Sequence, residues 1–304
     1  MKTVRGKTVV AVSMLLSLAS WSFAGELRGP TLQEPPPAVA EFTELSLGNF
    51  FSAGWNEPWS RRPRPDGAPD LTLLRVQSNM LLRALRTDYS LERPLETSSE
   101  RRVQTVNQLI EYSFNRRLMI ALIGNYEWID ARTGEDESGW TYGALARFQL
   151  VDTCRSSYAL NFRAMAPNHE LGEKKTTLSF ALAGWHDLTP LGLDRMGLYW
   201  HVQEITYLGP RAPGAKANDL TYAVSLAKTW TGSDATFGNL TTFVETYART
   251  DLDGENAGRT TVTLTPGVRC TFAHRHTLIA GIDLPLSTPR PNEQLFRLTY
   301  VFSF

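Results

Sequence analysis

The chain of 304 residues carries 31 basic and 31 acidic side chains, so its formal net charge is zero. This balance gives no reason to expect nucleic acid as a partner. No run of about 18 or more apolar residues follows residue 24, which excludes a transmembrane helix beyond that point. With 42% hydrophobic and 20% charged residues, the composition suits a chain in which apolar and polar side chains alternate.

The first 24 residues have the pattern of a secretory signal peptide. Lys2, Arg5 and Lys7 form a basic start, residues 9–19 form a short apolar core, and residues 22–24 offer a small-x-small cleavage site. An uncleaved anchor is the alternative. Cleavage would remove three of the 31 basic residues and no acid, which leaves 28 against 31 and a net charge near −3.

Residues 25–70 form a proline-rich extension. Prolines 35–37 and the proline-rich stretch 61–69 forbid a central strand or a long helix there. Between them, apolar residues spaced by three and four predict a short amphipathic helix around residues 41–54.

From Leu71 onward, apolar and polar residues alternate in segments separated by turn-rich breaks, which is the pattern of β-strands. In residues 140–151, for example, Trp140 and Tyr142 alternate with Thr141 and Gly143. We expect about twelve strands, near residues 72–90, 102–114, 118–130, 140–151, 157–166, 175–186, 197–208, 219–230, 239–250, 260–272, 276–287 and 295–304.

The breaks between these strands alternate in length. Those after odd-numbered strands are polar and mostly longer, and those after the second, fourth and tenth strands are short. Long loops on one side and short turns on the other are typical of a barrel with both chain ends on the same side of a membrane. The breaks at residues 187–196 and 231–237 are longer than this pattern requires.

The terminal strand has an apolar face. Every second residue from Phe296 to Phe304 is aromatic or leucine, and Arg297, Thr299 and Ser303 lie between them. An exposed edge of this kind promotes aggregation, but closure of a barrel removes the edge. The ending Tyr300-x-Phe302-x-Phe304 resembles the C-terminal signature of bacterial outer-membrane β-barrels. The resemblance implies that these three residues are the signal read by the barrel assembly machinery.

These observations together predict an all-β fold, a transmembrane antiparallel up-and-down β-barrel of about twelve strands with a short N-terminal extension. The expected division is a signal peptide at residues 1–24, an extension at 25–70 and an outer-membrane barrel at 71–304. The extension is either a periplasmic tail at the barrel mouth or a plug in the lumen, and it is too short for an autotransporter passenger. A soluble sandwich or secreted adhesin is the alternative fold.

If the apolar residues face lipid, the alternate residues line a lumen. Charges inside a barrel wall are kept only if they are hydrated or paired. Both signs occur, with arginine in excess, so the set predicts either a bracing network of ion pairs or a water-filled pore with a slight anion preference. Phe243 and Tyr247 also face inward. The charged lumen-lining candidates are Arg75, Arg83, Glu111, Glu127, Arg147, Arg163, Glu245, Arg249, Arg269, Asp283 and Arg297.

No enzymatic motif stands out. The His-x-Ser-Asn-Gly motif of outer-membrane phospholipases is absent, none of the five histidines has an obvious serine partner, and no nucleotide-binding or zinc-protease motif occurs. The pair His274-x-His276 is too little for a metal site. We therefore expect no enzyme activity, no metal and no cofactor. Cys154 and Cys270 belong to strands far apart in order and are expected to be free thiols.

Residues 263–269 (Thr-Leu-Thr-Pro-Gly-Val-Arg), followed by a turn and residues 278–283, resemble a hairpin of the family named for the meta-pathway of phenol degradation. Those proteins are regarded as outer-membrane transporters. The resemblance covers about 40 residues and implies passive uptake of small solutes, aromatic ones among them, but it transfers no binding residues. A closed structural or adhesive barrel is the first alternative function, and a lipid-modifying enzyme is the second.

Overall fold

Twelve antiparallel strands close into a barrel in which each strand pairs with its neighbours in sequence and β1 pairs with β12. This confirms the expected fold class and the expected number of strands. The computed structural model describes residues 42–60, 67–93, 101–131, 136–167, 175–210, 214–232, 238–288 and 294–304. The chain divides into two units, residues 1–42 and 43–304, and every described residue except Phe42 belongs to the second.

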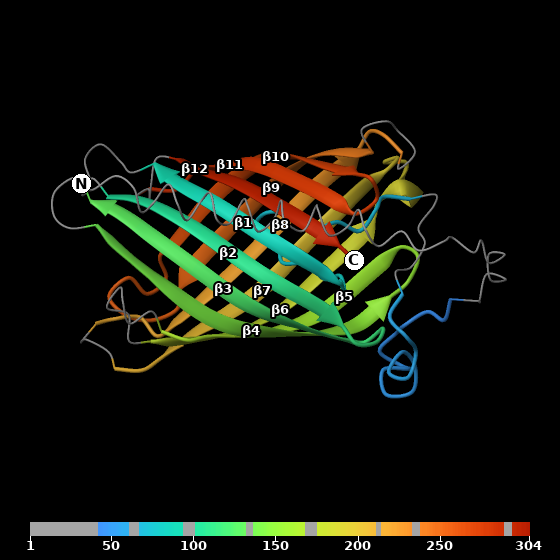
Figure 1. The fold of residues 1–304 in the computed structure, drawn as a ribbon, viewed down its shortest axis with the longest axis horizontal. Helices are drawn as coiled ribbons and strands as arrows, with labels where there is room; N and C mark the ends of the chain where they lie inside the picture. The colour runs from blue at the N-terminus through green and yellow to red at the C-terminus, as the bar shows by residue number, and fades with distance from the viewer. Residues whose placement is uncertain are drawn as a thin grey trace, which may run out of the picture. The chain divides into compact units, whose positions relative to one another are not determined.

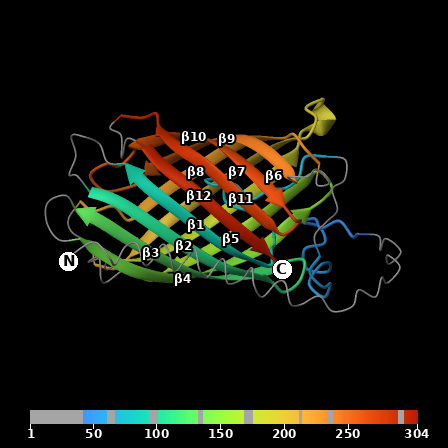
Figure 2. The same ribbon diagram turned by 45° about the horizontal axis from the view of Figure 1, so that its top comes forward.

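The strands run at a slant around the wall (Figures 1 and 2). One short 3-10 helix, η2 (Thr189–Leu191), lies in the break between β6 and β7. The strands are β1 (Ala84–Arg93), β2 (Arg101–Ser113), β3 (Leu118–Ala131), β4 (Glu137–Asp152), β5 (Ser156–Met165), β6 (Thr176–Asp187), β7 (Met196–Leu208), β8 (Asn218–Thr229), β9 (Asn239–Asp251), β10 (Thr260–Phe272), β11 (His276–Pro285) and β12 (Gln294–Ser303).

The two mouths of the barrel are distinguished by the ends of the chain. We call the mouth where β1 begins and β12 ends the proximal mouth, and the opposite one the distal mouth. The short breaks of the sequence, such as residues 114–117 and 273–275, lie at the proximal mouth. None of the helices among the described residues has the length and apolarity needed to cross a membrane.

The expected first strand, residues 72–90, is wrong in its first half, because β1 begins only at Ala84. Residues 71–83 do alternate, but they lie inside the barrel, where Leu71, Leu73 and Val76 are buried. The alternation in residues 71–83 therefore does not come from a strand of the barrel wall. It comes from a segment whose side chains lie within the lumen. The inward residues of β1 are Ala84 and those at even positions after it, which is the reverse of the expected facing.

The expected helix at residues 41–54 is also wrong, because residues 42–60 form turns and two isolated β-bridges. Ser46 and Asn49 exchange backbone-to-side-chain hydrogen bonds, which fold the chain into a local turn instead of a helix. Leu45 bridges to Asp152 and Pro58 to Asn115, so this segment lies at the proximal mouth, beside the end of β12 in Figures 1 and 2. The expected signal peptide and the first part of the extension lie outside the described residues.

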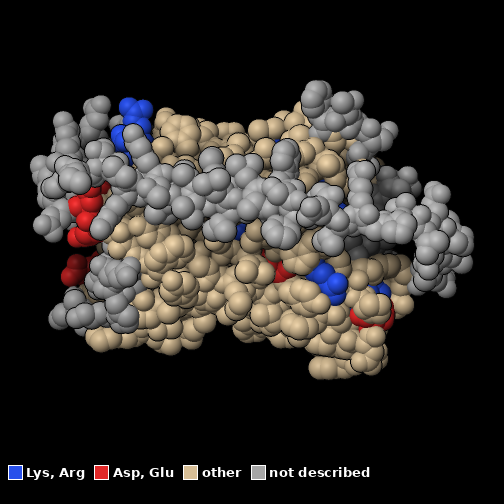
Figure 3. All heavy atoms as spheres, in the orientation of Figure 1, with Lys and Arg blue, Asp and Glu red and all other residues tan. Residues whose placement is uncertain are grey.

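The outer face of the wall is apolar. Exposed hydrophobic side chains occur on nearly every strand, and most of the described surface on the face in Figure 3 is uncharged. Near the proximal mouth, the ring of His276 stacks on Phe272 and lies beside Tyr300 and Phe302. Near the distal mouth, Trp140 packs against neighbouring tyrosines. Such aromatic belts are typical of barrels that meet the two interfaces of a membrane.

Candidate functional site: the lumen and its inlay

Residues 67–83 enter the lumen from the proximal mouth and return to it, and we call this segment the inlay. At its entry, the backbone amide of Ala68 donates to the Asp187 carboxylate at 3.0 Å, and the Tyr199 hydroxyl donates to the carbonyl oxygen of Pro69. At its exit, the Ser113 hydroxyl donates to the carbonyl oxygen of Leu82 at 2.7 Å. Both anchors lie at proximal strand ends, so the inlay is a loop suspended inside the barrel.

The turning point of the inlay is held by one carboxylate of the wall. Glu245 on β9 has no exposed surface, and it accepts backbone N–H groups from Leu74 at 3.2 Å, Arg75 at 3.1 Å and Val76 at 2.9 Å. Successive amides that converge on one anion form a nest, which supplies the positive partial charge that a buried carboxylate needs. On the other side of the turn, the amide of Gln77 donates to Nδ1 of His201 at 3.0 Å. The sequence placed Glu245 in the lumen but could not show that its partner is backbone.

A second carboxylate holds the side chain of Arg75. Asp283 on β11 is almost fully buried and pairs with both Arg75 and Arg297, the latter at 2.8 Å. The Thr265 hydroxyl also donates to Asp283, at 2.6 Å, and the guanidinium of Arg75 lies 4.6 Å from the centre of the Tyr247 ring. Two arginines and one hydroxyl therefore satisfy the buried carboxylate of Asp283. Removal of one of these partners would destabilise the fold, because part of the buried charge would then be unpaired.

The returning arm of the inlay is held by Arg147 on β4. Its guanidinium donates to the carbonyl oxygen of Met80 and to Oδ1 of Asn161 at 2.7 Å, and it lies 3.7 Å from Glu111. The amide group of Asn161 in turn donates to the side chain of Gln77 at 3.1 Å. These polar contacts fix both arms of the inlay to the wall.

Below the turning point, the lumen is filled by apolar side chains. One cluster joins Leu71, Leu73 and Val76 of the inlay to Trp185, Tyr199 and Phe243 of the wall, and a second joins Met80 and Leu82 to side chains of β2–β4 and β12. Burial of each large apolar side chain contributes about 1.5–3 kcal/mol. Among the described residues, the proximal half of the barrel is therefore filled by packed side chains of the inlay and the wall.

Above the turning point, the lumen is open and polar. A cavity of about 550 Å³ is floored by inlay residues 74–78 and walled by β1 to β7, β9 and β12. This volume falls within the range of about 300–1,000 Å³ that is typical of ligand sites. Five arginines and three carboxylates line the cavity, namely Arg75, Arg86, Arg147, Arg163 and Arg297 with Asp88, Glu111 and Glu127.

Arg163 differs from the other arginines of this cavity. No hydrogen bond or ion pair joins its guanidinium to another described residue, and its buried Nε atom has no hydrogen-bond partner. Arg147, in contrast, is paired with Glu111, and Arg297 with Asp283. A positive charge without a protein partner beside an open cavity is suited to attract an anion.

The remaining lumen candidates are spread between the two mouths. Arg249 donates to Asp219 at 2.9 Å and to the Tyr207 hydroxyl at 2.7 Å, Arg269 is buried in β10, and Glu127 lines the distal cavity. Arg75 lies on the inlay and not on the wall. Arg83 lies at the proximal mouth, stacked on Trp59 and Tyr112, and so is not a deep lumen residue. Arg86 and Asp88 were not predicted to face the lumen, because the first strand was predicted with its inner and outer faces exchanged.

Arg117, in the proximal turn between β2 and β3, holds residues 43–59 at the mouth. Its guanidinium donates to the carbonyl oxygens of Ala53 and Gln149, both at 2.9 Å, and to Oδ1 of Asn49 at 2.8 Å. Burial lowers the pKa of Arg117 from its usual value, and the positive charge of Arg116 lowers it further. This role could not be predicted from the sequence, in which Arg117 is only part of a short polar turn.

One serine does lie beside a histidine, which corrects the expectation that none would. On the outer face near the proximal mouth, Oγ of Ser156 is 3.2 Å from Nδ1 of His186, and the Tyr158 hydroxyl is 3.2 Å from Nε2. A hydrolytic triad needs a carboxylate or amide to orient the histidine. Among the described residues, no carboxylate or amide side chain forms a hydrogen bond with His186, so this group lacks the third member of a triad. Both cysteines are free thiols, as expected.

Comparisons with known proteins give a fold but no family. No protein-family model matches the chain, and no curated protein matches it. A solved outer-membrane channel from Pseudomonas putida F1, described as COG4313, is similar over 81% of this chain and 100% of its own, with 14% identity and a TM-score of 0.50. The KdgM porin is similar over 73% of this chain and 99% of its own, with 10% identity and a TM-score of 0.46. The β domain of the Bordetella autotransporter BrkA is similar over 73% of this chain and 98% of its own, with 12% identity and a TM-score of 0.49.

At 14% identity, the likeness to the COG4313 channel bears on the fold alone, and it agrees with the closed barrel. The resemblance to the meta-pathway family is not shown by any family model, and it remains a prediction from the hairpin at residues 263–283.

Proposed function

We propose that the chain is an outer-membrane channel for small solutes whose lumen is closed, in the conformation described, by the inlay. The observation that carries the proposal is the division of the lumen into an open, charged distal cavity and a packed proximal half. A purely structural barrel has no need of a hydrated cavity of this size. A solute would enter from the distal mouth and meet the floor formed by residues 74–78.

The expected signal peptide and the aromatic terminal strand support an outer membrane of the Gram-negative type. In this proposal both ends of the barrel chain, and so the proximal mouth, lie in the periplasm. The distal cavity then faces the exterior. In this account the partners are outer-membrane lipid, the barrel assembly machinery and a small solute, with no nucleic acid, no cofactor and no enzymatic step.

The lining of the cavity favours anionic solutes. Five arginines and three carboxylates line it, and Asp283, which is not part of the lining, pairs with Arg75 and Arg297. The guanidinium of Arg163 forms no hydrogen bond or ion pair with another described residue, so its charge is the one that is left to attract an anion. The ring of Tyr247, on the β9 side of the cavity, adds an aromatic surface, so small aromatic anions combine both preferences.

Transport into liposomes tests this proposal. Proteoliposomes should swell in isotonic benzoate faster than in isotonic benzylamine, and faster than liposomes without protein. No swelling above the protein-free rate with any solute would overturn the channel proposal and favour a closed structural barrel, for which the apolar packing of the inlay is the supporting observation. The lipid-modifying alternative is checked in the same vesicles, where we expect neither wild type nor Ser156→Ala to release fatty acid.

A further inference from the structure

Glu204 on β7 is a carboxylate on the outer face of the barrel wall. Its neighbours His201 and Gln203 are buried in the lumen, whereas Val202 is 47% exposed and Glu204 is also exposed. Its partners across the strands are Phe180 and Leu220, both on the outer face. No hydrogen bond or ion pair joins Glu204 to any other described residue.

The position of this carboxylate is unusual within the described wall. The other outward-facing charged residues of the described strands, namely Arg93, Arg102, Asp130 and Lys228, lie within two residues of a strand end. Glu204 lies four residues before the end of β7, roughly 10 Å along the axis of a slanted barrel. A charge on the lipid-facing side is costly unless it is paired or reaches the interface.

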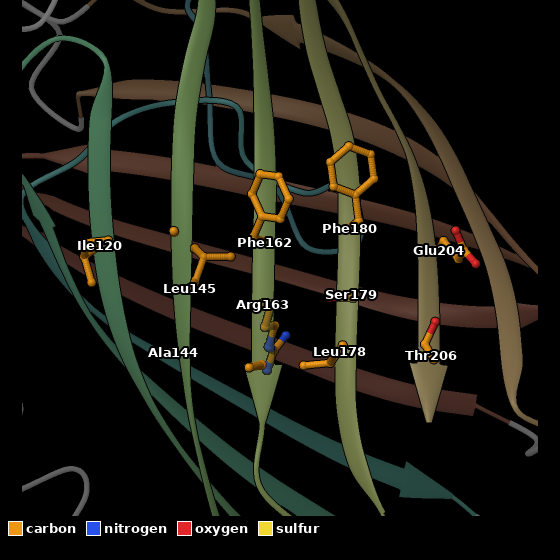
Figure 4. Close-up of a pocket in the computed structure, with 12 residues that line it drawn as sticks. Ile120, Ala144, Leu145, Phe162, Arg163, Leu178, Ser179, Phe180, Glu204 and Thr206 are labelled. Atoms are coloured by element: carbon orange, nitrogen blue, oxygen red, sulfur yellow. The ribbon is translucent and has the colours of Figure 1, made fainter. Parts of the chain in front are cut away.

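A groove begins beside Glu204 and crosses the outer face over β6, β5 and β4. It has a volume of about 520 Å³. Its floor is made by the small side chains of Ala144, Ala146 and Ala164, and its sides include the rings of Phe162 and Phe180. Figure 4 shows Glu204 on one strand, with Phe180 and Phe162 on the next two.

The register explains why these residues form one continuous feature. Glu204 pairs with Phe180, Phe180 with Phe162, and Phe162 with Ala146. Successive side chains of this row therefore lie side by side on the same face. An apolar trough ends at a carboxylate, which is the shape and charge expected of a site for an amphiphile with a cationic head.

A second copy of the chain fits this surface poorly. Two copies in one membrane have the same orientation, so a cation for Glu204 would have to lie on the outer face at a similar depth. Among the described strands, the outward-facing cations lie at the strand ends. Lipid, in contrast, surrounds this face of a membrane barrel and brings both an acyl chain and a headgroup.

We propose that this groove binds a membrane lipid that carries an amino group, with an acyl chain over the alanine floor and the ammonium group paired with Glu204. The proposal rests on the membrane-spanning barrel of the proposed function, but it does not depend on the lumen or on solute passage. An ammonium–carboxylate pair at the edge of hydrocarbon is less screened than one in water.

Native mass spectrometry of the refolded chain tests the site. Dioleoylphosphatidylethanolamine should be retained as one bound molecule, and dioleoylphosphatidylglycerol should be retained about tenfold less. Glu204→Gln should abolish this preference between headgroups, and Ala146→Phe should reduce retention of both lipids by filling the groove. Leu226→Ala, on the outer face away from the groove, is the matched control and should behave as wild type.

Three outcomes would overturn the site. Equal retention of both lipids by wild type would show that the groove does not select the headgroup. An unchanged preference in Glu204→Gln would show that the selectivity does not come from this carboxylate. A dimer that Glu204→Gln dissociates would assign the face to a second copy. Failure of the proposed function would be detected by separate measurements. The heat-dependent shift in gel mobility measures insertion into bilayers, and swelling of proteoliposomes measures solute passage.

Discussion

The backbone amide of Arg75 lies 3.1 Å from both carboxylate oxygens of Glu245, at the turning point of the inlay. With the amides of Leu74 and Val76, it makes Glu245 the acceptor of a three-residue nest at mid-barrel. The contact joins a residue of the N-terminal segment to one 170 positions later in the chain. It links the barrel wall directly to the segment that lies in its lumen.

Replacement of this carboxylate should loosen the inlay. In Glu245→Gln the side chain keeps one oxygen, but its NH₂ group then faces backbone donors that have no other acceptor. We expect the turning point to lose about 2 kcal/mol, since hydrogen bonds to charged groups contribute about 1.5–3 kcal/mol. The measurement is hydrogen exchange of residues 74–76, which should become faster. Glu137→Gln, at the distal end of β4, is the control, and equal exchange in both variants would contradict the role of Glu245.

Removal of the unpaired arginine should change charge selectivity. Arg163→Gln removes one positive charge from the lining of the distal cavity. A unit charge at about 10 Å in water changes the energy of a monovalent ion by roughly 0.4 kcal/mol, with opposite sign for anions and cations, so the preference for anions over cations should fall about fourfold. The reversal potential in a salt gradient measures this preference. Arg259→Gln, in the distal turn before β10, should leave it unchanged, and an equal shift in both variants would refute a local role for Arg163.

Loss of Arg117 should release the segment at the proximal mouth. In Arg117→Ala, the carbonyl oxygens of Ala53 and Gln149 lose their donor, and we expect local unfolding of residues 43–59 to become about 2 kcal/mol easier. Chymotrypsin cleavage near Phe50 should then be about 30-fold faster, while the barrel stays folded. Arg155→Ala, in another proximal turn, is the control. Unchanged cleavage in Arg117→Ala would show that other contacts hold the segment.

The terminal aromatic residue should matter for assembly. The backbone amide of Phe304 donates to the carbonyl oxygen of Arg83 at 3.0 Å, next to the start of β1, and its ring is 52% exposed. Deletion of Phe304 should reduce the heat-modifiable protein in the outer membrane several-fold. Phe51→Ala removes a ring that is 92% exposed and should have no such effect. A truncated chain that reaches the outer membrane at the normal level would defeat this prediction.

Most of the wall could be predicted from the sequence because its two faces meet different surroundings. Residues such as Trp140 and Tyr142 face outward and Thr141 inward, and this contrast repeats in every strand after the first. The prediction of the first strand failed for a physical reason, since the inlay also alternates but lies inside the barrel. The boundary at Ala84 depends on the pairing of β1 with β12, which local alternation does not reveal.

The site was predictable only in part. The alternation of apolar and polar residues predicted that four charged side chains face the lumen, and the structure also has them there, namely Glu111, Arg147, Glu245 and Asp283. It could not show which of them hold the inlay, because the partners of Glu245 are backbone amides distant in sequence. The packed proximal half likewise depends on contacts between the inlay and β6 to β11 that no local pattern contains.

The central claim is that the inlay closes an otherwise passable barrel. Single-channel conductance in planar bilayers tests it most directly, with wild type compared to a chain in which residues 67–82 are replaced by a Gly-Ser sequence of equal length. A flexible segment of this length spans about 22 Å and keeps residues 43–60 connected to β1. We predict small or rare openings for wild type and a larger, steady conductance for the replacement. An equally large conductance in both chains, or none in either, would contradict the claim.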